Sequence, residues 1–371
     1  MDPKNRPELP LSESWNDEIR SAIRCSKELL SFLSDDYSEL QTAHSKNFPL
    51  FIPLKLAMLI KNKGPQSALW RQFVPHSIED APSNGQDSYT DPIGDQVHMQ
   101  QGQLIHRYRN RALFLPTSKC PVICRYCFRK NELYDPKLEL LKPNFKLTKN
   151  YILEHPEIEE IIFSGGDPLM LSNSKINFYA QEFHTLDINF LRFHTRFPVI
   201  IPSRIDSQFC LLMEKLESKY KRVSLAIHVN HIEELDRKDV LDAIKRLKKT
   251  GIQLLSQTVL LNGINDCPQS LKTLFLKLGE IGITPYYLHH PDKVSGGEHF
   301  LLSIERGRNI YQQLQGELPG WCLPKYILDI PHGHGKVQIH NSENLAFSGE
   351  VLDRKLQPHS YNEIMPNFSP N

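Results

Sequence analysis

The sequence predicts an α/β protein, an incomplete (β/α)6 barrel with an N-terminal helical extension and a short C-terminal tail. Three observations predict this fold. Six short apolar segments occur between residues 112 and 289, they recur about every thirty residues from the second onward, and helix-like stretches separate several of them. Alternation of strands and helices produces parallel strands joined by right-handed crossovers. In such barrels the chemistry collects at the C-terminal ends of the strands.

The elements follow one another in a regular order. Apolar residues at helical spacing predict helices within residues 12–75, with 51–61 as a second helix candidate, and the Pro-, Gly- and Asn-rich residues 76–100 predict a loop or linker. The predicted strands are 112–115, 160–164, 190–194, 223–228, 254–260 and 285–289, and the clearest helices between them are 233–249 and 268–281. We therefore expect an N-terminal helical region and linker (1–100), a barrel (101–336) and a peripheral tail (337–371).

The composition narrows the class of protein. A chain of 371 residues with a net charge of +1 gives no sign of nucleic acid or an anionic membrane as a partner. The first ten residues lack the apolar core of a signal peptide, and the apolar run 50–60 is too short to cross a bilayer. An odd number of cysteines, 7, argues for metal ligation rather than a disulfide framework. We expect a cytoplasmic protein.

Three cysteines lie close together directly after the first predicted strand. Cys120, Cys124 and Cys127 form a C-x3-C-x2-C motif. A closed zinc site and an ordinary 4Fe-4S cluster each take four ligands. Three cysteines leave one iron of a 4Fe-4S cluster open to bind a small molecule. The alternative is a zinc site whose fourth ligand lies elsewhere, at Cys25 or His106.

Two further segments contain candidate functional residues. Gly165, Gly166 and Asp167 end the second predicted strand, where paired glycines allow a backbone edge to approach a ligand closely. In the segment Asp329-Ile-Pro-His-Gly-His-Gly-Lys336, the lysine is able to form a Schiff base with an aldehyde cofactor such as pyridoxal phosphate (PLP). The arginines of 107–111 would then bind its phosphate. A solvated basic edge and a surface lysine are the alternatives, and a metal site at His332 and His334 is a weaker one.

These motifs, in this order, resemble the lysine 2,3-aminomutase family of radical S-adenosylmethionine (SAM) enzymes. The resemblance runs from about residue 91 to about residue 336. It includes the following segments: His106-Arg-Tyr, Cys-x3-Cys-x2-Cys-x-Arg129, Phe163-Ser-Gly-Gly-Asp, His228-Val-Asn-His, Ser256-Gln-Thr-Val-Leu-Leu, Asn265-Asp-Cys-Pro, Pro285-Tyr-Tyr-Leu and Asp292-x5-Glu-His-Phe. The fold that the family implies is the radical SAM barrel.

The resemblance implies a role for each matching residue. Cys120, Cys124 and Cys127 would bind a 4Fe-4S cluster, and Gly165, Gly166, Asp167, His228 and Gln257 would line the SAM site. Lys336 would be the catalytic lysine that carries PLP, with Arg107 and Arg111 on the PLP phosphate. Arg129 would bind the substrate carboxylate, and Asp292 and Asp329 would bind the ε-ammonium of lysine.

The implied reaction moves the α-amino group of free L-lysine to the β-carbon and gives β-lysine. The paired aspartates favour lysine, because a buried ammonium needs compensating negative charge and a side-chain carboxylate would be repelled. An electron donor such as flavodoxin or ferredoxin would be the protein partner. Three alternatives stay open: the branch that makes (R)-β-lysine for elongation factor P, another amino-acid substrate, and a non-enzymatic zinc-binding protein.

Two departures from the family pattern concern assembly and the lysine segment. The free-lysine enzymes of the family have an intersubunit zinc site, built from the cysteine that matches Cys267 and from later cysteines, whereas no cysteine follows Cys322 here. We therefore expect this zinc interface to be missing, although a homo-oligomer remains possible. His332 and His334 stand where glycine is common in the family, so the loop before Lys336 is expected to differ in shape.

Overall fold

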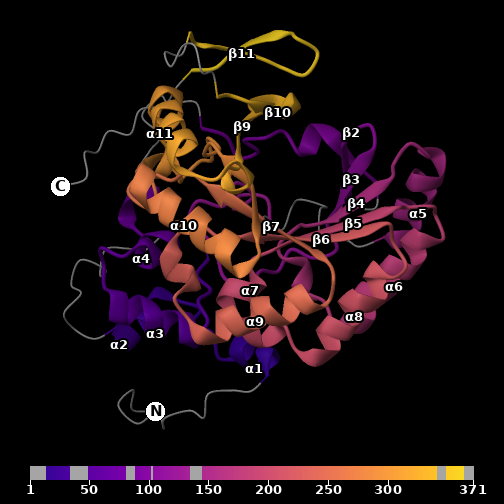
Figure 1. Ribbon diagram of the computed structural model, residues 1–371, viewed down its shortest axis with the longest axis horizontal. Coiled ribbons are helices and arrows are strands. Elements are labelled where there is room, and N and C mark those ends of the chain that lie inside the picture. Colours follow the sequence, from indigo (N-terminus) through magenta and orange to yellow (C-terminus); the bar gives the residue numbers. More distant parts are fainter. Residues whose placement is uncertain are drawn as a thin grey trace.

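The computed structural model describes residues 14–33, 49–80, 88–101, 103–133, 144–340 and 348–362. Within them, ten strands form one sheet whose spatial order, β1 to β10, follows the chain. Strands β3 to β9 are parallel, while β1 and β2 at one edge and β10 at the other pair antiparallel. Figure 1 shows the sheet curled within a layer of helices. Because β1 and β10 stay apart as separate edges, the predicted incomplete barrel is confirmed.

The predicted strands agree closely with the observed ones. The sheet contains β1 (Met99–Gln100), β2 (Leu104–Tyr108), β3 (Arg111–Phe114), β4 (Glu160–Phe163), β5 (Phe190–Thr195), β6 (Arg222–His228), β7 (Gln253–Val259), β8 (Thr284–His289), β9 (Lys325–Ile330) and β10 (Gly335–Gln338). The six predicted strands are β3 to β8. Strand β9 adds a seventh parallel strand that the sequence analysis did not predict, and it places Asp329 inside the sheet rather than in a loop.

Helices cross over between the parallel strands and cover the outside of the sheet (Figure 1). They are α5 (Phe145–Glu154), α6 (Asn173–His184), α7 (Phe197–Ile200), α8 (Ser207–Glu217), α9 (Lys238–Lys249), α10 (Pro268–Ile281) and α11 (Ile304–Glu317). Helix α10 has its predicted bounds, because Pro268 suits the first turn and Gly282 ends the helix in the left-handed conformation. Helix α9 begins later than predicted, since Ile232–Leu235 first forms a separate 3-10 turn, η8.

The N-terminal extension packs onto the barrel. Its helices are α1 (Trp15–Arg20), α2 (Ser26–Leu33), α3 (Leu54–Lys63) and α4 (Ala68–Phe73). Buried residues of this region, such as Leu33 and Phe73, belong to the same apolar core as the strands. Helix α3 starts after Pro53, which explains why it is shorter at its N-terminus than the predicted 51–61. Part of the predicted 12–75 helical region, residues 12–13 and 34–48, lies outside the described residues.

Two predictions about the edges of the barrel need correction. Residues 76–100 are no simple linker: their described part contains η3 (Ser77–Asp80), η4 (Gln96–His98) and β1, and Asp95 is buried. The tail is not peripheral either. Strand β10 extends the sheet, and a hairpin of β11 (Glu350–Leu352) and β12 (Pro358–Ser360) follows it. Buried Tyr361 lies 4.0 Å below the Lys293 ammonium.

The remaining 3-10 turns are η6 (Pro168–Met170), η7 (Pro202–Arg204), η9 (Glu298–Phe300), η10 (Gly320–Cys322) and η11 (Pro331–Gly333). No helix among the described residues combines the length and the apolar character that a bilayer crossing requires.

Candidate active site

One cavity of about 1070 Å³ runs through the inside of the half-barrel. Its wall extends from the N-terminal ends of the strands, near Glu160 and Arg222, to their C-terminal ends, near Asp167 and His228. The wall includes every site residue predicted from the sequence: Arg107, Arg111, Cys120, Cys124, Cys127, Arg129, Gly165, Gly166, Asp167, His228, Gln257, Asp292, Asp329 and Lys336. The structure therefore brings together residues from six strands (β2, β3, β6, β7, β9 and β10) and from the loops after β3, β4 and β8.

The three cysteines lie in the loop that follows β3, here called the cysteine loop (residues 117–127). None of the three forms a disulfide among the described residues, and all three line the cavity. Burial, and then the neighbouring Cys124, raise the pKa of the Cys127 thiol to about 12. Cys25 and His106 do not line the cavity; Cys25 is exposed, and His106 bonds to Tyr151 and to the Arg109 carbonyl. Neither of the two candidate fourth zinc ligands therefore lies beside the cysteines in the cavity. The three thiols fit a 4Fe-4S cluster with one open iron.

The Gly165–Gly166 pair holds the cysteine loop against the end of β4. The Gly166 amide donates to the Thr117 carbonyl at 2.8 Å, and the Asp167 amide donates to the Lys119 carbonyl at 2.8 Å. A Cβ atom at Gly166 would lie 2.3 Å from the Lys119 carbonyl oxygen, and one at Gly165 would lie 2.4 Å from that of Thr117. Glycine is required here because two backbones touch. The pair was predicted to approach a ligand; in the structure it closely approaches the cysteine loop.

Asp167 is an internal hydrogen-bond acceptor at the same strand ends. Its carboxylate accepts the Thr195 hydroxyl at 2.8 Å and the amides of Arg196 and Leu169 at 2.7 and 3.0 Å. Burial raises its pKa to about 6 despite these bonds. The carboxylate therefore joins the end of β4 to the end of β5, next to the proposed SAM site.

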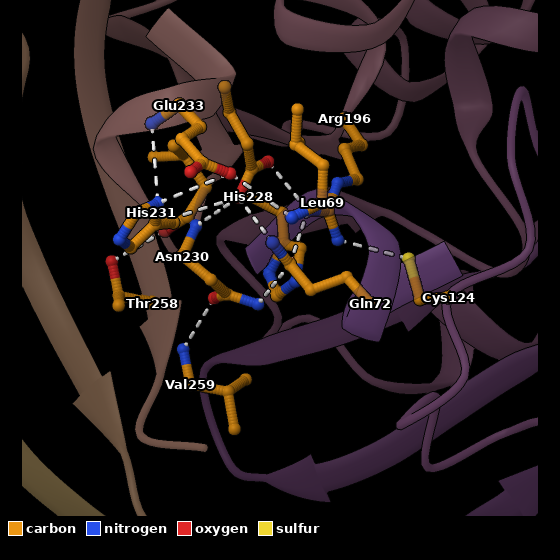
Figure 2. Close-up of polar contacts among 12 residues, drawn as sticks. Leu69, Gln72, Cys124, Arg196, His228, Asn230, His231, Glu233, Thr258 and Val259 are labelled. Atoms are coloured by element: carbon orange, nitrogen blue, oxygen red, sulfur yellow. Dashed lines mark hydrogen bonds and ion pairs between the residues drawn. The ribbon is translucent and has the colours of Figure 1, made fainter. Parts of the chain in front are cut away.

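Figure 2 shows a buried polar network behind Cys124 that the sequence analysis missed. Arg196, directly after β5, donates from Nη1 to the Cys124 sulfur at 3.0 Å. Its Nη2 donates to Gln72 at 2.9 Å and to Glu234 at 2.5 Å. Gln72 lies on α4, so the N-terminal extension helps to hold the cysteine loop in place. The signal in the sequence was the position of Arg196 at the C-terminal end of a barrel strand.

His228 and Gln257 lie at the ends of β6 and β7. His228 Nε2 is 2.8 Å from the hydroxyl of Tyr126, which stands between two of the cysteines. Burial and then the Arg196 charge lower the pKa of His228 well below its ordinary value, so its imidazole is neutral. Gln257 Nε2 is 3.3 Å from His194 Nε2. Both residues thus line the cavity beside the cysteine loop, and their role at a SAM site stays a prediction.

Alternating positive and negative side chains line the part of the cavity around Lys336. The Lys336 ammonium bonds to Asp329, and Asp329 also accepts from Arg107 at 3.3 Å. Arg107 reaches Asp95 at 3.0 Å, and Arg129 makes two bonds to the same Asp95, at 2.9 and 2.7 Å. Asp95 was missed because it lies in the segment interpreted as a linker. Only the start of the family resemblance, near residue 91, pointed to that segment.

The remaining predicted residues stand around this chain of charges. The Arg111 guanidinium lies 3.9 Å above the Tyr108 ring, and the Tyr108 hydroxyl accepts the Lys336 amide at 2.8 Å. Burial, and then the Asp329 charge, raise the pKa of Asp292 to about 8. Asp329 itself has a lowered pKa because Lys336 and Arg107 outweigh its burial. The two acids are therefore electrostatic neighbours: the pKa of Asp292 is raised, and that of Asp329 is lowered.

Comparison with known proteins agrees with this geometry. A model of the radical SAM superfamily matches residues 114–274. The chain is 37% identical to an L-lysine 2,3-aminomutase of Haemophilus influenzae over 327 residues, which cover 87% of this chain and 95% of that protein. It is 34% identical to the Escherichia coli enzyme of the same name, over 86% and 93% of the two chains. With the Clostridium subterminale enzyme of that name it shares 28% identity, over 88% and 78%.

The half-barrel with three cysteines after its first parallel strand defines a radical SAM enzyme. Enzymes of this class use a 4Fe-4S cluster and SAM, and the cysteine loop and the strand ends around it suit both. Within the class, identity of 34–37% over most of the chain shows that the protein belongs to the lysine 2,3-aminomutase family.

Proposed function

We propose that the protein is an L-lysine 2,3-aminomutase that uses PLP and converts L-lysine to β-lysine. The observation that carries the proposal is the pair of neighbouring acids, Asp292 and Asp329, at the end of the cavity that holds Lys336. Two carboxylates in a poorly solvated site resist ionising together, as the raised pKa of Asp292 shows. A cation placed between them removes this penalty. The ε-ammonium of lysine is such a cation, whereas a glutamate side chain would add a third negative charge.

The cationic residues suit the anionic groups of substrate and cofactor. Arg107 and Arg129 share Asp95, and Arg107 and Lys336 share Asp329, so three cations on that wall face two carboxylates. Arg129 also donates to Ser164 at 3.1 Å, so its guanidinium is held rigidly. A substrate α-carboxylate beside Arg129 would satisfy the excess charge, and bidentate geometry would orient it.

The residues present also fit PLP. Lys336 is accessible from the cavity, and Arg111 lies close to the backbone of Lys336 through Tyr108. The Arg107 Nε atom is buried and has no hydrogen-bond partner among the described residues, so a donor is left for a phosphate oxygen. Lys336, Arg107 and Arg111 would hold the cofactor. When bound, the cluster and SAM supply a 5'-deoxyadenosyl radical, and PLP supplies a π-system that stabilises the radical during the amino shift.

The protein's own residues position the reactants. Asp292 and Asp329 would fix one end of lysine and Arg129 the other, so that the β-carbon has one orientation relative to the SAM site at His228 and Gln257. Neutral His289 lines the same wall, since burial and then the Lys336 charge lower its pKa to about 3. Such an imidazole stays neutral, so it adds no positive charge beside the Lys336 ammonium.

The experiment that tests the proposal is an anaerobic assay of purified, cluster-reconstituted protein with SAM, PLP, dithionite and L-lysine. Formation of β-lysine supports it, and the handedness of the product separates its two biological versions. The R isomer would support the branch that modifies elongation factor P, and the S isomer would support free-lysine metabolism. SAM cleavage without β-lysine would discard the substrate and direct the assay to other amino acids.

A further inference from the structure

A second group of metal-binding side chains lies outside the cavity, where the tail hairpin meets the segment before Lys336. His334, Asp353 and His359 each offer a donor atom, and all three atoms lie within 4.8 Å of one another. His334 precedes β10, Asp353 follows β11, and His359 lies on β12. None of the three residues lines the cavity. The group therefore joins two parts of the chain that the candidate active site does not use for ligands.

The geometry of the group is already close to that of a metal site. His359 Nε2 lies 3.1 Å from Asp353 Oδ2, and the rings of His334 and His359 have centroids 3.7 Å apart. The other Asp353 oxygen, Oδ1, accepts the amides of Lys355 at 2.7 Å and Gln357 at 3.0 Å. These two bonds fix the orientation of the carboxylate, so that Oδ2 faces the histidines.

We propose that His334, Asp353 and His359 bind one divalent transition-metal ion, with Zn²⁺ as the ion that the donors suit. Imidazole nitrogen and carboxylate oxygen are both zinc ligands with bond lengths of about 2.0–2.2 Å, and a tetrahedral ion holds its donors about 3.3 Å apart. The His359–Asp353 separation of 3.1 Å matches this spacing, and the third donor needs only a small movement. Three protein ligands leave the fourth position for water.

The same atoms also allow a simpler arrangement, a His359–Asp353 hydrogen bond with His334 stacked on it. That arrangement uses His334 only as a stacked ring, whereas a metal ion would use its nitrogen as a third ligand. The structure also separates the two histidines of the lysine segment. His332 packs edge-on against Tyr89, with ring centroids 5.0 Å apart, and is not a member of the group.

A metal ion at this site would connect the tail hairpin to the segment that carries Lys336. His334 lies two residues before Lys336, whose amide is already held by Tyr108. From the turn of the hairpin, Arg354 donates to the Arg107 carbonyl at 2.9 Å and lies 4.7 Å above the Tyr108 ring. The ion would thus fix the hairpin over β2 and hold the backbone that presents Lys336. This inference is independent of the proposed substrate and of PLP.

The test measures zinc directly in the cluster-reconstituted protein. Wild-type protein is dialysed anaerobically against chelator-buffered Zn²⁺, and zinc and iron are determined by mass spectrometry. We expect about one zinc ion per chain, with the iron content unchanged. His359→Gln, which keeps an amide donor for Asp353 but removes the imidazole ligand, should lower bound zinc at least tenfold. His184→Ala, an exposed histidine on α6, is the control and should bind zinc as the wild type does.

Thermal unfolding gives a second measurement that does not depend on activity. An ion that binds only the folded state raises the melting temperature. Zn²⁺ should therefore raise it for the wild type and for His184→Ala, and leave it unchanged for His359→Gln. Equal zinc content in the wild type and His359→Gln, or no zinc in the wild type, would overturn the proposal. Loss of all zinc in the control as well would also do so.

Discussion

Replacing Asp292 with Asn tests whether the acid pair selects lysine. The variant removes the charge and keeps the shape of the side chain. An ionised acid that hydrogen-bonds to an ammonium contributes about 2 kcal/mol, so the KM for L-lysine should rise roughly thirtyfold where Asp292 is ionised. Asp239→Asn on α9 is the matched control, because that acid is exposed and does not line the cavity. Its KM should equal that of the wild type.

The pH dependence makes this prediction sharper. Because the pKa of Asp292 is raised to about 8, the wild-type acid is largely protonated at pH 7 and must lose its proton before it pairs with lysine. One pKa unit corresponds to a factor of about ten, so the wild-type KM should fall roughly tenfold between pH 7 and pH 9. The ratio of variant to wild-type KM should then grow from about three at pH 7 to about thirty at pH 9.

The assay is the initial rate of β-lysine formation at each pH, with saturating SAM and PLP. L-Norleucine, which lacks the ε-amine, serves as a competitive inhibitor whose binding should be the same in the two proteins. A KM ratio near one, or a ratio that does not change with pH, would refute the assignment of Asp292 to the substrate ammonium.

Further predictions concern the lysine, the glycine pair, the network behind the cluster and stability. Lys336→Ala should abolish rearrangement but keep binding of SAM to the cluster, as measured by electron paramagnetic resonance; full activity would exclude the PLP assignment. Gly166→Ala places a Cβ atom 2.3 Å from a carbonyl oxygen of the cysteine loop and should lower the iron bound per chain, while Gly316→Ala, with no atom within 4 Å, should not. Arg196→Gln breaks a buried ion pair and should cost about 3–5 kcal/mol in the free energy of unfolding. Because the folded-state pKa of Asp292 is raised to about 8, the cofactor-free wild type should lose stability as the pH rises from about 4 to about 8, and Asp292→Asn should lose less over the same range.

Local patterns in the sequence were sufficient to predict the parallel core. The strands β3 to β8 are short apolar segments, and α10 has a proline and a glycine at its ends. Strand β9 was missed because its apolar residues stand next to a segment rich in glycine and histidine, which was interpreted as a loop. Its identity as a strand is evident only from its parallel pairing with β8.

The ligand-like residues were predicted because they form compact motifs, whereas their supporting residues were not. Asp95 is 34 positions from Arg129, and Gln72 is 124 positions from Arg196. Such pairs follow no pattern in the sequence, because the fold brings residues together that are far apart along the chain. The same reason explains why His359 was not associated with His334. The Gly165–Gly166 pair was found, but its contact with the cysteine loop required the structure.

The most direct test of the central claim is the product of the anaerobic reaction with L-lysine. The reconstituted protein with SAM, PLP and dithionite should form β-lysine, identified by chiral chromatography and mass spectrometry, and Lys336→Ala and Cys124→Ala should form none. A protein that holds its cluster and PLP, cleaves SAM, and yet returns L-lysine unchanged would contradict the claim that this cavity is built for a lysine amino shift.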